Sequence, residues 1–246
     1  LVVNAVSNVL GTALPLPALA ERARAAGARI LVDTAQAAGH RPLSLRADGA
    51  DLVAFTGHKG MLGPQGIGGL WVREGVDPVP LLRGGTGGDS TLLDMPEPMP
   101  DRLEAGTGNA PGMAGLVAGI DEVRARGVER IHAELSRLKA RLRSGLADLP
   151  GVRVLSPTAP GGAPIVTVTA DALTPSALAE RLDREWGVEV RAGLHCAPRV
   201  HRLLGTVETG AVRFSLGWAS TDADVERALE GVEAMAVARP GAISSS

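Results

Sequence analysis

The sequence predicts an α/β fold, built from a mostly parallel sheet and a smaller α/β unit that follows it. Apolar residues in the first part form near-continuous runs at 1–6, 29–33 and 51–56, where a half-exposed strand would alternate. Such runs are typical of strands covered on both faces. A helical pattern separates the first two runs, as expected when a helix joins parallel strands.

Turn and cap residues allow the first elements to be assigned in chain order. Pro17 opens and Gly27 closes a helix at 18–26. Residues 74–110 are rich in Gly and Pro without periodicity, and an irregular stretch of that length is usually functional. The strands predicted in this part are 1–6, 29–33, 51–56 and 67–73.

A second group of elements begins near residue 127. We therefore predict an incomplete large domain over 1–127, a small α/β domain over 128–240 and a tail over 241–246. The expected helices from here on, with the one just before the boundary, are 111–126, 128–148, 175–186 and 221–237. The expected strands are 152–155, 164–169, 188–191 and 211–216.

Composition excludes several classes of protein. The chain is 45% hydrophobic and 21% charged, so it can bury a core and is not disordered. Its net charge of −2 does not favour nucleic-acid binding. No apolar stretch approaches the roughly 20 residues that a membrane span needs. The single cysteine fits a reducing compartment, so a cytoplasmic location is expected.

The ends of the chain also carry an expectation. Leu1 lies inside a strand-like apolar run and no initiator Met precedes it, while Ser244–Ser246 carries no packing signal. We expect an N-terminal truncation relative to a complete fold.

Lysine is nearly absent, and only Lys59 and Lys139 occur beside many arginines. Lys59 follows the run 51–56 and lies in a glycine-flanked turn. An amine can lose its proton and attack a carbonyl, whereas a guanidinium stays protonated. Lys139 lies on an amphipathic helix with its basic residues outside, so we expect it to be solvated.

Asp33 ends the neighbouring apolar run. A carboxylate and a lysine at adjacent strand ends indicate a pyridoxal phosphate (PLP) site, where the acid pairs with the pyridinium nitrogen and the lysine holds the aldehyde. Gln36 follows three residues later and would face the same side if a helical turn begins there. Taken alone, Asp33 is equally consistent with a turn or a helix cap.

Two polar turns could bind a phosphate. Thr56 and His58 supply a hydroxyl and an imidazole beside Lys59. Thr107 lies in a glycine-flanked turn before a helix, and helix N-termini attract phosphates. A plain helix-entry turn also explains Thr107.

The only cysteine, Cys196, lies in a Gly/Pro loop beside His195 and near Arg191. Most lone cysteines are buried as small hydrophobes, but positive neighbours favour the reactive thiolate. A metal site made of His195, Cys196 and His201 lacks a fourth ligand, so we predict none. Arg213 lies on an otherwise apolar strand and is expected to face a substrate carboxylate or a structural ion-pair partner.

Taken together, these segments resemble the cysteine desulfurase branch of the class V aminotransferases, which are fold-type I PLP enzymes. The order and spacing of the matching motifs are specific, and they cover almost the whole chain. The motifs are Ser7–Gly11, Val32–Gln36, Thr56–Lys59, Gly63–Gly66, Glu104–Thr107, Arg191–Ala197 and Val212–Ser215.

The resemblance implies a role for each matching residue. Lys59 would bind the cofactor covalently, and Cys196 would accept the sulfur. The cofactor would also be held by Asp33, Gln36, Thr56, His58, Asn8 and, across a homodimer, Thr107 of the other subunit. The substrate would be bound by Asn8, Arg213, Arg191 and His195.

The implied reaction is conversion of L-cysteine to L-alanine, with the sulfur left as a persulfide on Cys196 and passed to an acceptor protein. Other class V reactions on the same scaffold are alternatives, namely transamination, epimerisation or selenocysteine cleavage. A truncated, non-catalytic remnant is a further alternative.

Overall fold

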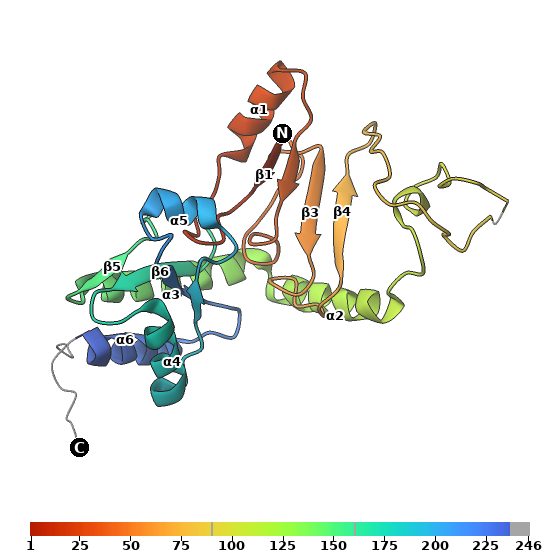
Figure 1. Ribbon diagram of the computed structural model, residues 1–246. Helices are drawn as coiled ribbons and strands as arrows, with labels where there is room; N and C mark the ends of the chain where they lie inside the picture. The colour runs from red at the N-terminus through yellow and green to blue at the C-terminus, as the bar shows by residue number, and fades with distance from the viewer. Residues whose placement is uncertain (90, 160, 237–246) are drawn as a thin grey trace.

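The computed structural model describes residues 1–89, 91–159 and 161–236, so the predicted tail 241–246 lies outside the described residues. Two four-stranded sheets organise these residues, one in each half of the chain (Figure 1). The predicted α/β fold with a mostly parallel first sheet is confirmed. No helix in these described ranges is both long and apolar enough to cross a membrane.

The first sheet has the order β1-β2-β3-β4. The first three strands are parallel, and β4 is antiparallel to β3. Asp33 at the end of β2 pairs with Asn4 of β1 and with Ala54 of β3, so the carboxyl ends of the three parallel strands meet at one edge. The strands are β1 (Val2–Asn4), β2 (Leu31–Asp33), β3 (Leu52–Thr56) and β4 (Gly68–Val72).

Helix α1 (Leu16–Ala25) covers part of this sheet. Its buried side chains, Leu16 among them, pack with Ile30, Val32 and Val53 in one apolar cluster. The helix has Pro17 in its first turn, and Gly27 beyond its end adopts a positive φ of 68°. Both residues act as the sequence predicts.

An irregular arm, defined as residues 74–89 and 91–109, leaves β4 and extends away from both sheets, as the yellow segment of Figure 1 shows. In these described residues a short 3₁₀ turn (η1, Asp101–Leu103) is the one helical element. The arm returns to α2 (Ala110–Arg126), where the Asn109 side chain accepts a hydrogen bond from Gly112 N at 3.0 Å. That bond satisfies one of the free N–H groups at the start of the helix.

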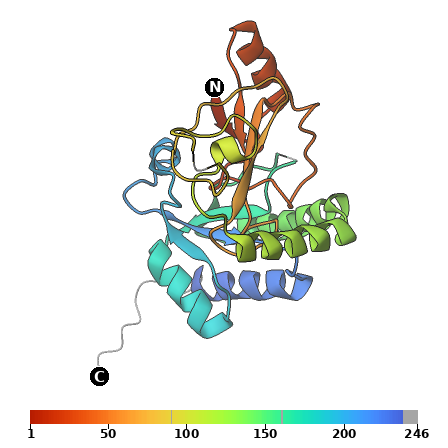
Figure 2. The ribbon, with the colours of Figure 1, turned by 90° about the vertical axis from the view of Figure 1, so that its right-hand side faces the viewer.

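The second sheet is antiparallel, with the order β5-β6-β8-β7. Three helices bury one face of it in a Leu- and Val-rich core that includes Leu142, Val166 and Leu182. In Figure 2 the green helices α2 and α3 lie between the orange strands of the first sheet and the blue helix α6. The elements are α3 (Val128–Asp148), α4 (Pro175–Trp186), α6 (Asp222–Ala236), β5 (Val152–Val154), β6 (Ile165–Ala170), β7 (Arg191–Gly193) and β8 (Ala211–Ser215).

Most predicted elements appear within a few residues of their predicted bounds, with two clear differences. The strand expected at 188–191 forms instead at Arg191–Gly193. Helix α5 (Pro198–Leu204) was expected to be loop. It has only seven residues and begins at a proline, so it is too short to show a helical periodicity in the sequence. The division into domains at 127 stays a prediction.

Candidate active site

The carboxyl-end edge of the first sheet presents Asp33. Its side chain is exposed, and Oδ1 accepts a hydrogen bond from Ala35 N at 2.8 Å. This hydrogen bond closes a turn. Of the turn and the helix cap that the sequence left open for Asp33, the structure shows the turn. In addition, the turn points the carboxylate out of the sheet edge, where ligands of open parallel sheets bind.

Lys59 follows the adjacent strand in a tightly closed turn. Gly63 N donates to Gly57 O at 2.8 Å, and Leu62 N donates to Lys59 O at 3.0 Å. A Cβ at Gly60 would lie 2.3 Å from Ala38 O, so the Lys59 turn packs directly on the turn that follows Asp33. The two predicted residues thus lie on contacting turns at one sheet edge.

The lowered pKa of His40 is consistent with this contact between the Asp33 turn and the Lys59 turn. Its pKa lies below the ordinary value of 6.5, mainly because the ring is removed from water and also because of the positive charge of Lys59. Gln36 belongs to this same turn and is half-buried.

Thr56 and His58 lie together beside Lys59, with Thr56 Oγ1 and His58 Nδ1 2.9 Å apart. Thr107 is elsewhere: its turn is held to the arm by a bond from Gly106 N to Gly85 O at 2.7 Å. In the described part of the chain no hydrogen bond joins Thr107 to another predicted site residue. Within one subunit it is therefore not part of the site.

The loop that contains Asn8 links the two sheets. Asn8 Nδ2 donates to His195 O at 2.6 Å, and Asn8 O accepts from Arg213 Nη1 at 3.0 Å. The same loop is fixed from behind by Thr167, whose hydroxyl donates to Val9 O at 2.5 Å. One turn upstream, Ala5 N donates to Asp33 O at 2.8 Å. Asn8 thereby joins the Asp33 edge to the loop that carries Cys196.

Arg213 faces this junction because of strand register. It lies opposite Thr167 of β6 and Arg191 of β7, so all three side chains are on the face of the second sheet that the helices leave open. Burial lowers the pKa of Arg213, and the neighbouring charge of Arg191 lowers it further. Its guanidinium donates to Asn8 O and Ser215 Oγ and has no carboxylate partner in the described ranges, which removes the ion-pair alternative there.

Cys196 is exposed at the tip of a strained turn. Both His195 and Cys196 have positive φ, 53° and 58°, a conformation that side-chain-bearing residues rarely adopt. Arg191 Nη2 lies 3.4 Å from the Cys196 sulfur. The default expectation of a buried, inert cysteine is therefore wrong for this position, and the loop displays the thiol beside a cation.

His195 has a different environment from the one expected of a substrate-binding residue. It is 2% exposed, and both ring nitrogens face protein atoms: Nε2 is 2.9 Å from Arg191 O, and Nδ1 is 3.2 Å from His201 Nε2. His201 Nδ1 in turn lies 2.8 Å from Thr206 Oγ1. The sequence suggested His201 only as a metal ligand and gave no sign of Thr206, because nothing in their spacing shows that His201 contacts both His195 and Thr206. In the residues that the structure describes, no group of three metal-binding side chains occurs.

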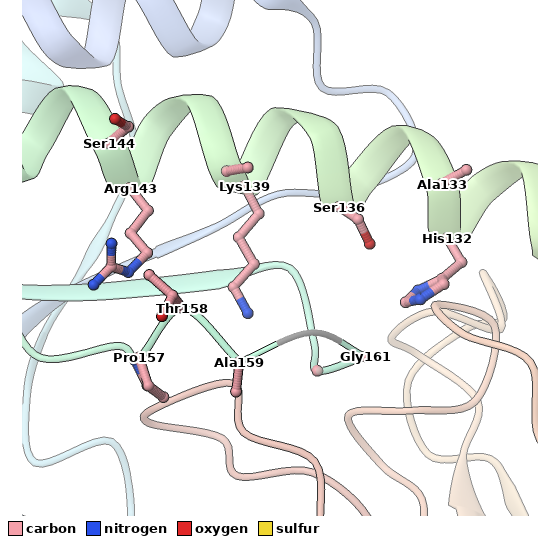
Figure 3. Close-up of a pocket in the computed structure, with 12 residues that line it drawn as sticks. His132, Ala133, Ser136, Lys139, Arg143, Ser144, Pro157, Thr158, Ala159 and Gly161 are labelled. Carbon is pink, nitrogen blue, oxygen red and sulfur yellow. The ribbon is translucent and has the colours of Figure 1, made fainter.

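Lys139 requires a correction. The prediction of a solvated side chain is wrong, because Lys139 is half-buried and burial lowers its pKa. Figure 3 shows it pointing from α3 across a cavity of about 610 Å³ toward the segment that includes Pro157 and Ala159. None of the predicted site residues lines this cavity, so the predicted site and the cavity beside α3 are separate places in the structure.

With this geometry established, comparison with known proteins gives the family. The family model described as aminotransferase class-V matches residues 1–228.

The chain belongs to the class-V aminotransferases.

Two curated relatives from this family's desulfurases are similar to the chain along most of its length. A probable cysteine desulfurase of Xylella fastidiosa (strain Temecula1) is 38% identical over 234 residues, which cover 92% of this chain and 54% of the relative. One from Streptomyces coelicolor is 37% identical and covers 93% of this chain and 55% of the relative. The chain thus spans about half the length of the curated relatives it matches.

Solved structures agree with the family. The apo structure of a cysteine desulfurase from Thermococcus onnurineus matches with a TM-score of 0.87 and 37% identity, over 96% of this chain and 59% of that protein. The cysteine desulfurase CsdA from Escherichia coli matches with a TM-score of 0.85 and 28% identity, over 95% of this chain and 58% of that protein.

Proposed function

We propose that this chain carries the site of a PLP-dependent cysteine desulfurase, which converts L-cysteine to L-alanine and keeps the sulfur as a persulfide on Cys196. The relatives named cysteine desulfurase support the activity. The observation that carries the proposal is the double contact of Asn8, to His195 O and from Arg213 Nη1. This contact supports the proposal because it ties the loop of the exposed Cys196 to the segment that follows β1, the strand that pairs with β2 at Asp33.

The strand-end residues fit the cofactor. The exposed Asp33 carboxylate commits only Oδ1 to the backbone, so Oδ2 is available for a protonated ring nitrogen. Thr56 and His58 offer a hydroxyl and an imidazole for the phosphate. When bound, PLP supplies an aldehyde and an electron sink. Lys59 would hold it, and the half-buried Gln36 would contact the ring hydroxyl.

Arg213 and Asn8 would orient the substrate. A half-buried guanidinium without a carboxylate partner in the described ranges is suited to bind the substrate carboxylate. Arg191 lies next to it in register and also touches the Cys196 sulfur. A carboxylate bound here would direct the substrate side chain toward Cys196.

Two residues would carry out the chemical steps. The free amine of Lys59 would move the proton at the substrate Cα. The Cys196 thiolate would then form an S–S bond to the substrate sulfur while the substrate C–S bond breaks. The electron pair of that bond stays on the carbon skeleton, which takes up a proton to give alanine. The thiolate of an acceptor protein would then attack the outer sulfur of the persulfide. The S–S bond to Cys196 breaks, Cys196 leaves as a thiolate, and the persulfide is now on the acceptor.

A homodimer is part of the proposal. Of the fourteen large hydrophobic residues that are exposed in the described part of the chain, eight lie between Val79 and Val117, in the arm and the start of α2. Apolar surface gathered on one segment is typical of a subunit interface. Thr107 lies in that same segment and could reach the phosphate of the partner. A cytoplasmic location, for which the single cysteine is the argument, belongs to the same proposal.

The test uses the protein expressed from its complete reading frame and supplied with PLP. Borohydride reduction and peptide mapping should place the pyridoxyl group on Lys59. Lys139, the other lysine of the 246 residues given, is a matched control, so Lys139→Ala should keep the label and Lys59→Ala should lose it. Label on Lys139 in the parent would refute the cofactor assignment.

Cys196→Ser tests the reaction itself. This variant should retain the visible absorbance of bound PLP but release no alanine from L-cysteine, because no thiol remains to accept the sulfur. Alanine release at the parent rate would exclude the desulfurase mechanism and favour another class V reaction, such as transamination. Absence of PLP binding in the parent would favour a non-catalytic protein.

A further inference from the structure

Behind the Cys196 turn lies a row of three buried polar side chains: His195, His201 and Thr206. They are 2%, 0% and 2% exposed, respectively. The two imidazole rings are stacked, with centroids 5.4 Å apart and an interplanar angle of 29°. Buried polar groups carry a large energetic penalty unless each finds a partner, and here each one does.

The positions of the protons follow from the one atom in the row that can only accept. Arg191 O is a carbonyl oxygen, so His195 Nε2, at 2.9 Å, must carry the hydrogen. In a neutral ring, His195 Nδ1 is then an acceptor. It receives the hydrogen of His201 Nε2 at 3.2 Å, which leaves His201 Nδ1 to accept from the Thr206 hydroxyl at 2.8 Å. All donors in the row point the same way, from Thr206 toward Arg191 O.

The surroundings favour the neutral rings that this assignment requires. The pKa of His195 is lowered chiefly by burial and also by the positive charges of Arg213 and Arg191, although its bond to Arg191 O acts in the opposite direction. Burial also lowers the pKa of His201. A second proton on His201 would point a hydrogen at Thr206 Oγ1, so the hydroxyl would have to donate instead to His201 O, at the longer distance of 3.5 Å. Neutral imidazoles are thus the state that keeps the 2.8 Å bond from Thr206 to the ring.

The row is attached to the strained part of the cysteine loop. His195 and Cys196 both adopt positive φ. His195 is held at its ring by His201 and Arg191 and at its carbonyl by Asn8. His201 sits on α5, and Thr206 N donates to His201 O at 2.9 Å just beyond the helix end. Because His195 directly precedes Cys196, motion of the His195 ring would change the direction in which the Cys196 thiol points.

We propose that His201 and Thr206 are positioning residues for sulfur transfer, which act through His195 to hold the strained turn that aims Cys196 at the substrate. The proposal rests on the proposed function for the role of the thiol. It also assigns His195 a structural task, since neither of its ring nitrogens is free for the substrate or the thiol. None of the three side chains would touch the reacting atoms.

The first test is spectroscopic and independent of activity. In the full-length protein with ¹⁵N-labelled histidine, NMR should show two neutral imidazoles with the proton on Nε2 at pH 7.5, assigned by their loss in His195→Gln and His201→Gln. Thr206→Val should shift the His201 Nδ1 signal, whereas Thr209→Val, in the same loop but exposed, should not. Either ring as the Nδ1–H tautomer or as an imidazolium would overturn the assignment.

The second test is kinetic. His201→Leu removes the donor to His195 and should lower kcat for alanine release about tenfold or more with little change in KM, because misplacing a nucleophile affects the chemical step. His201→Gln places an amide N–H near the position of Nε2 and should restore most of kcat. Thr206→Val should lower kcat about threefold, as expected for one lost hydrogen bond. His201→Leu with the parent kcat, or Gln no better than Leu, would overturn the proposal.

The two hypotheses fail in different ways. If the parent releases no alanine, or Cys196→Ser releases it at the parent rate, the proposed function is wrong. In that case the alkylation rate of Cys196, followed by mass spectrometry of its peptide, still tests the turn. His201→Leu should change that rate at pH 8 and His201→Gln should return it toward the parent value. Equal rates in parent and His201→Leu would mean that the row does not position the thiol.

Discussion

The two sheets of this molecule bury their side chains to different extents. The second sheet packs one face on three helices in a core of thirteen buried residues. In the loops that connect its strands, the buried polar side chains of His195, His201 and Thr206 hydrogen-bond to one another. The first sheet packs mainly on α1. It leaves Val2 and Leu70 exposed and continues into an arm with an apolar surface.

The same contrast holds for the polar residues of the site. At the edge of the first sheet, Asp33 and His58 are exposed, and Lys59 forms no side-chain hydrogen bond in the described residues. At the second sheet, Arg213 and His195 are held in place by hydrogen bonds. This difference indicates a division of labour: one region offers groups that a ligand and a second subunit would complete, and the other is preorganised. The predictions below test that division.

The largest effect is expected in the core of the second sheet. Leu142→Ala removes a 1%-exposed side chain from the core between the second sheet and its helices and should lower the free energy of unfolding by about 4 kcal/mol. Leu16→Ala, the matched substitution on α1, should cost about 2 kcal/mol because the thinner layer there can relax. Urea unfolding measures both. Equal losses would mean that the two sheets are equally well packed.

Charge on the arm should disrupt the proposed dimer. Leu81→Asp combined with Leu93→Asp places two carboxylates on apolar surface and should weaken self-association at least about a hundredfold, or ~2.7 kcal/mol. Leu203→Asp is the control, because this leucine is 89% exposed but lies outside the arm. Analytical ultracentrifugation measures the self-association of each variant. A parent that is monomeric, or a double variant that stays dimeric, contradicts the proposed interface.

Contact between the Asp33 and Lys59 turns should tolerate no added methyl group. Gly60→Ala would bring a Cβ within 2.3 Å of Ala38 O and should cost about 2 kcal/mol and weaken PLP binding. Gly217→Ala, where a Cβ meets open space, should have almost no effect on either. Thermal unfolding and PLP titration are the measurements. Unchanged PLP affinity in Gly60→Ala would separate this contact from the cofactor site.

The smallest effect should be the pH dependence of stability. The pKa values of His195 and His201 lie below 6.5 in the folded protein, so below pH 6.5 the unfolded chain binds protons that the folded one does not. Stability should therefore be unaffected by these groups above pH 6.5 and should fall as pH decreases, by up to about 1.4 kcal/mol per unit for each ring.

His201→Gln isolates one ring of this pair. Its stability should decline less steeply than that of the parent between pH 6.5 and 5.5, while at pH 8 the variant's pH slope should match the parent's. Urea unfolding at several pH values gives both slopes. Identical slopes below pH 6.5 would show that His201 is not buried as a neutral ring.

Much of the fold could be predicted because local patterns and tertiary packing agree. The helix predicted at 175–186 matches α4 residue for residue, since Thr174 caps it, Pro175 opens it and Gly187 ends it with a positive φ. Helix α5 could not be predicted, because a seven-residue helix draws its stability from packing rather than from its own sequence. For the same reason Lys139 was misjudged: its helix periodicity is amphipathic, but a facing segment covers its side chain.

The sequence by itself determined the residue types that the proposed chemistry would use: a lysine amine at Lys59, a carboxylate at Asp33 and one thiol at Cys196. Strand-end position is a local property, so their place at the ends of elements could be read from apolar runs and glycines. Only the tertiary structure decided what Asn8, His195 and His201 do. Their contacts join residues up to 205 positions apart, and hydrogen-bond direction depends on which acceptor each ring meets after the sheets have packed.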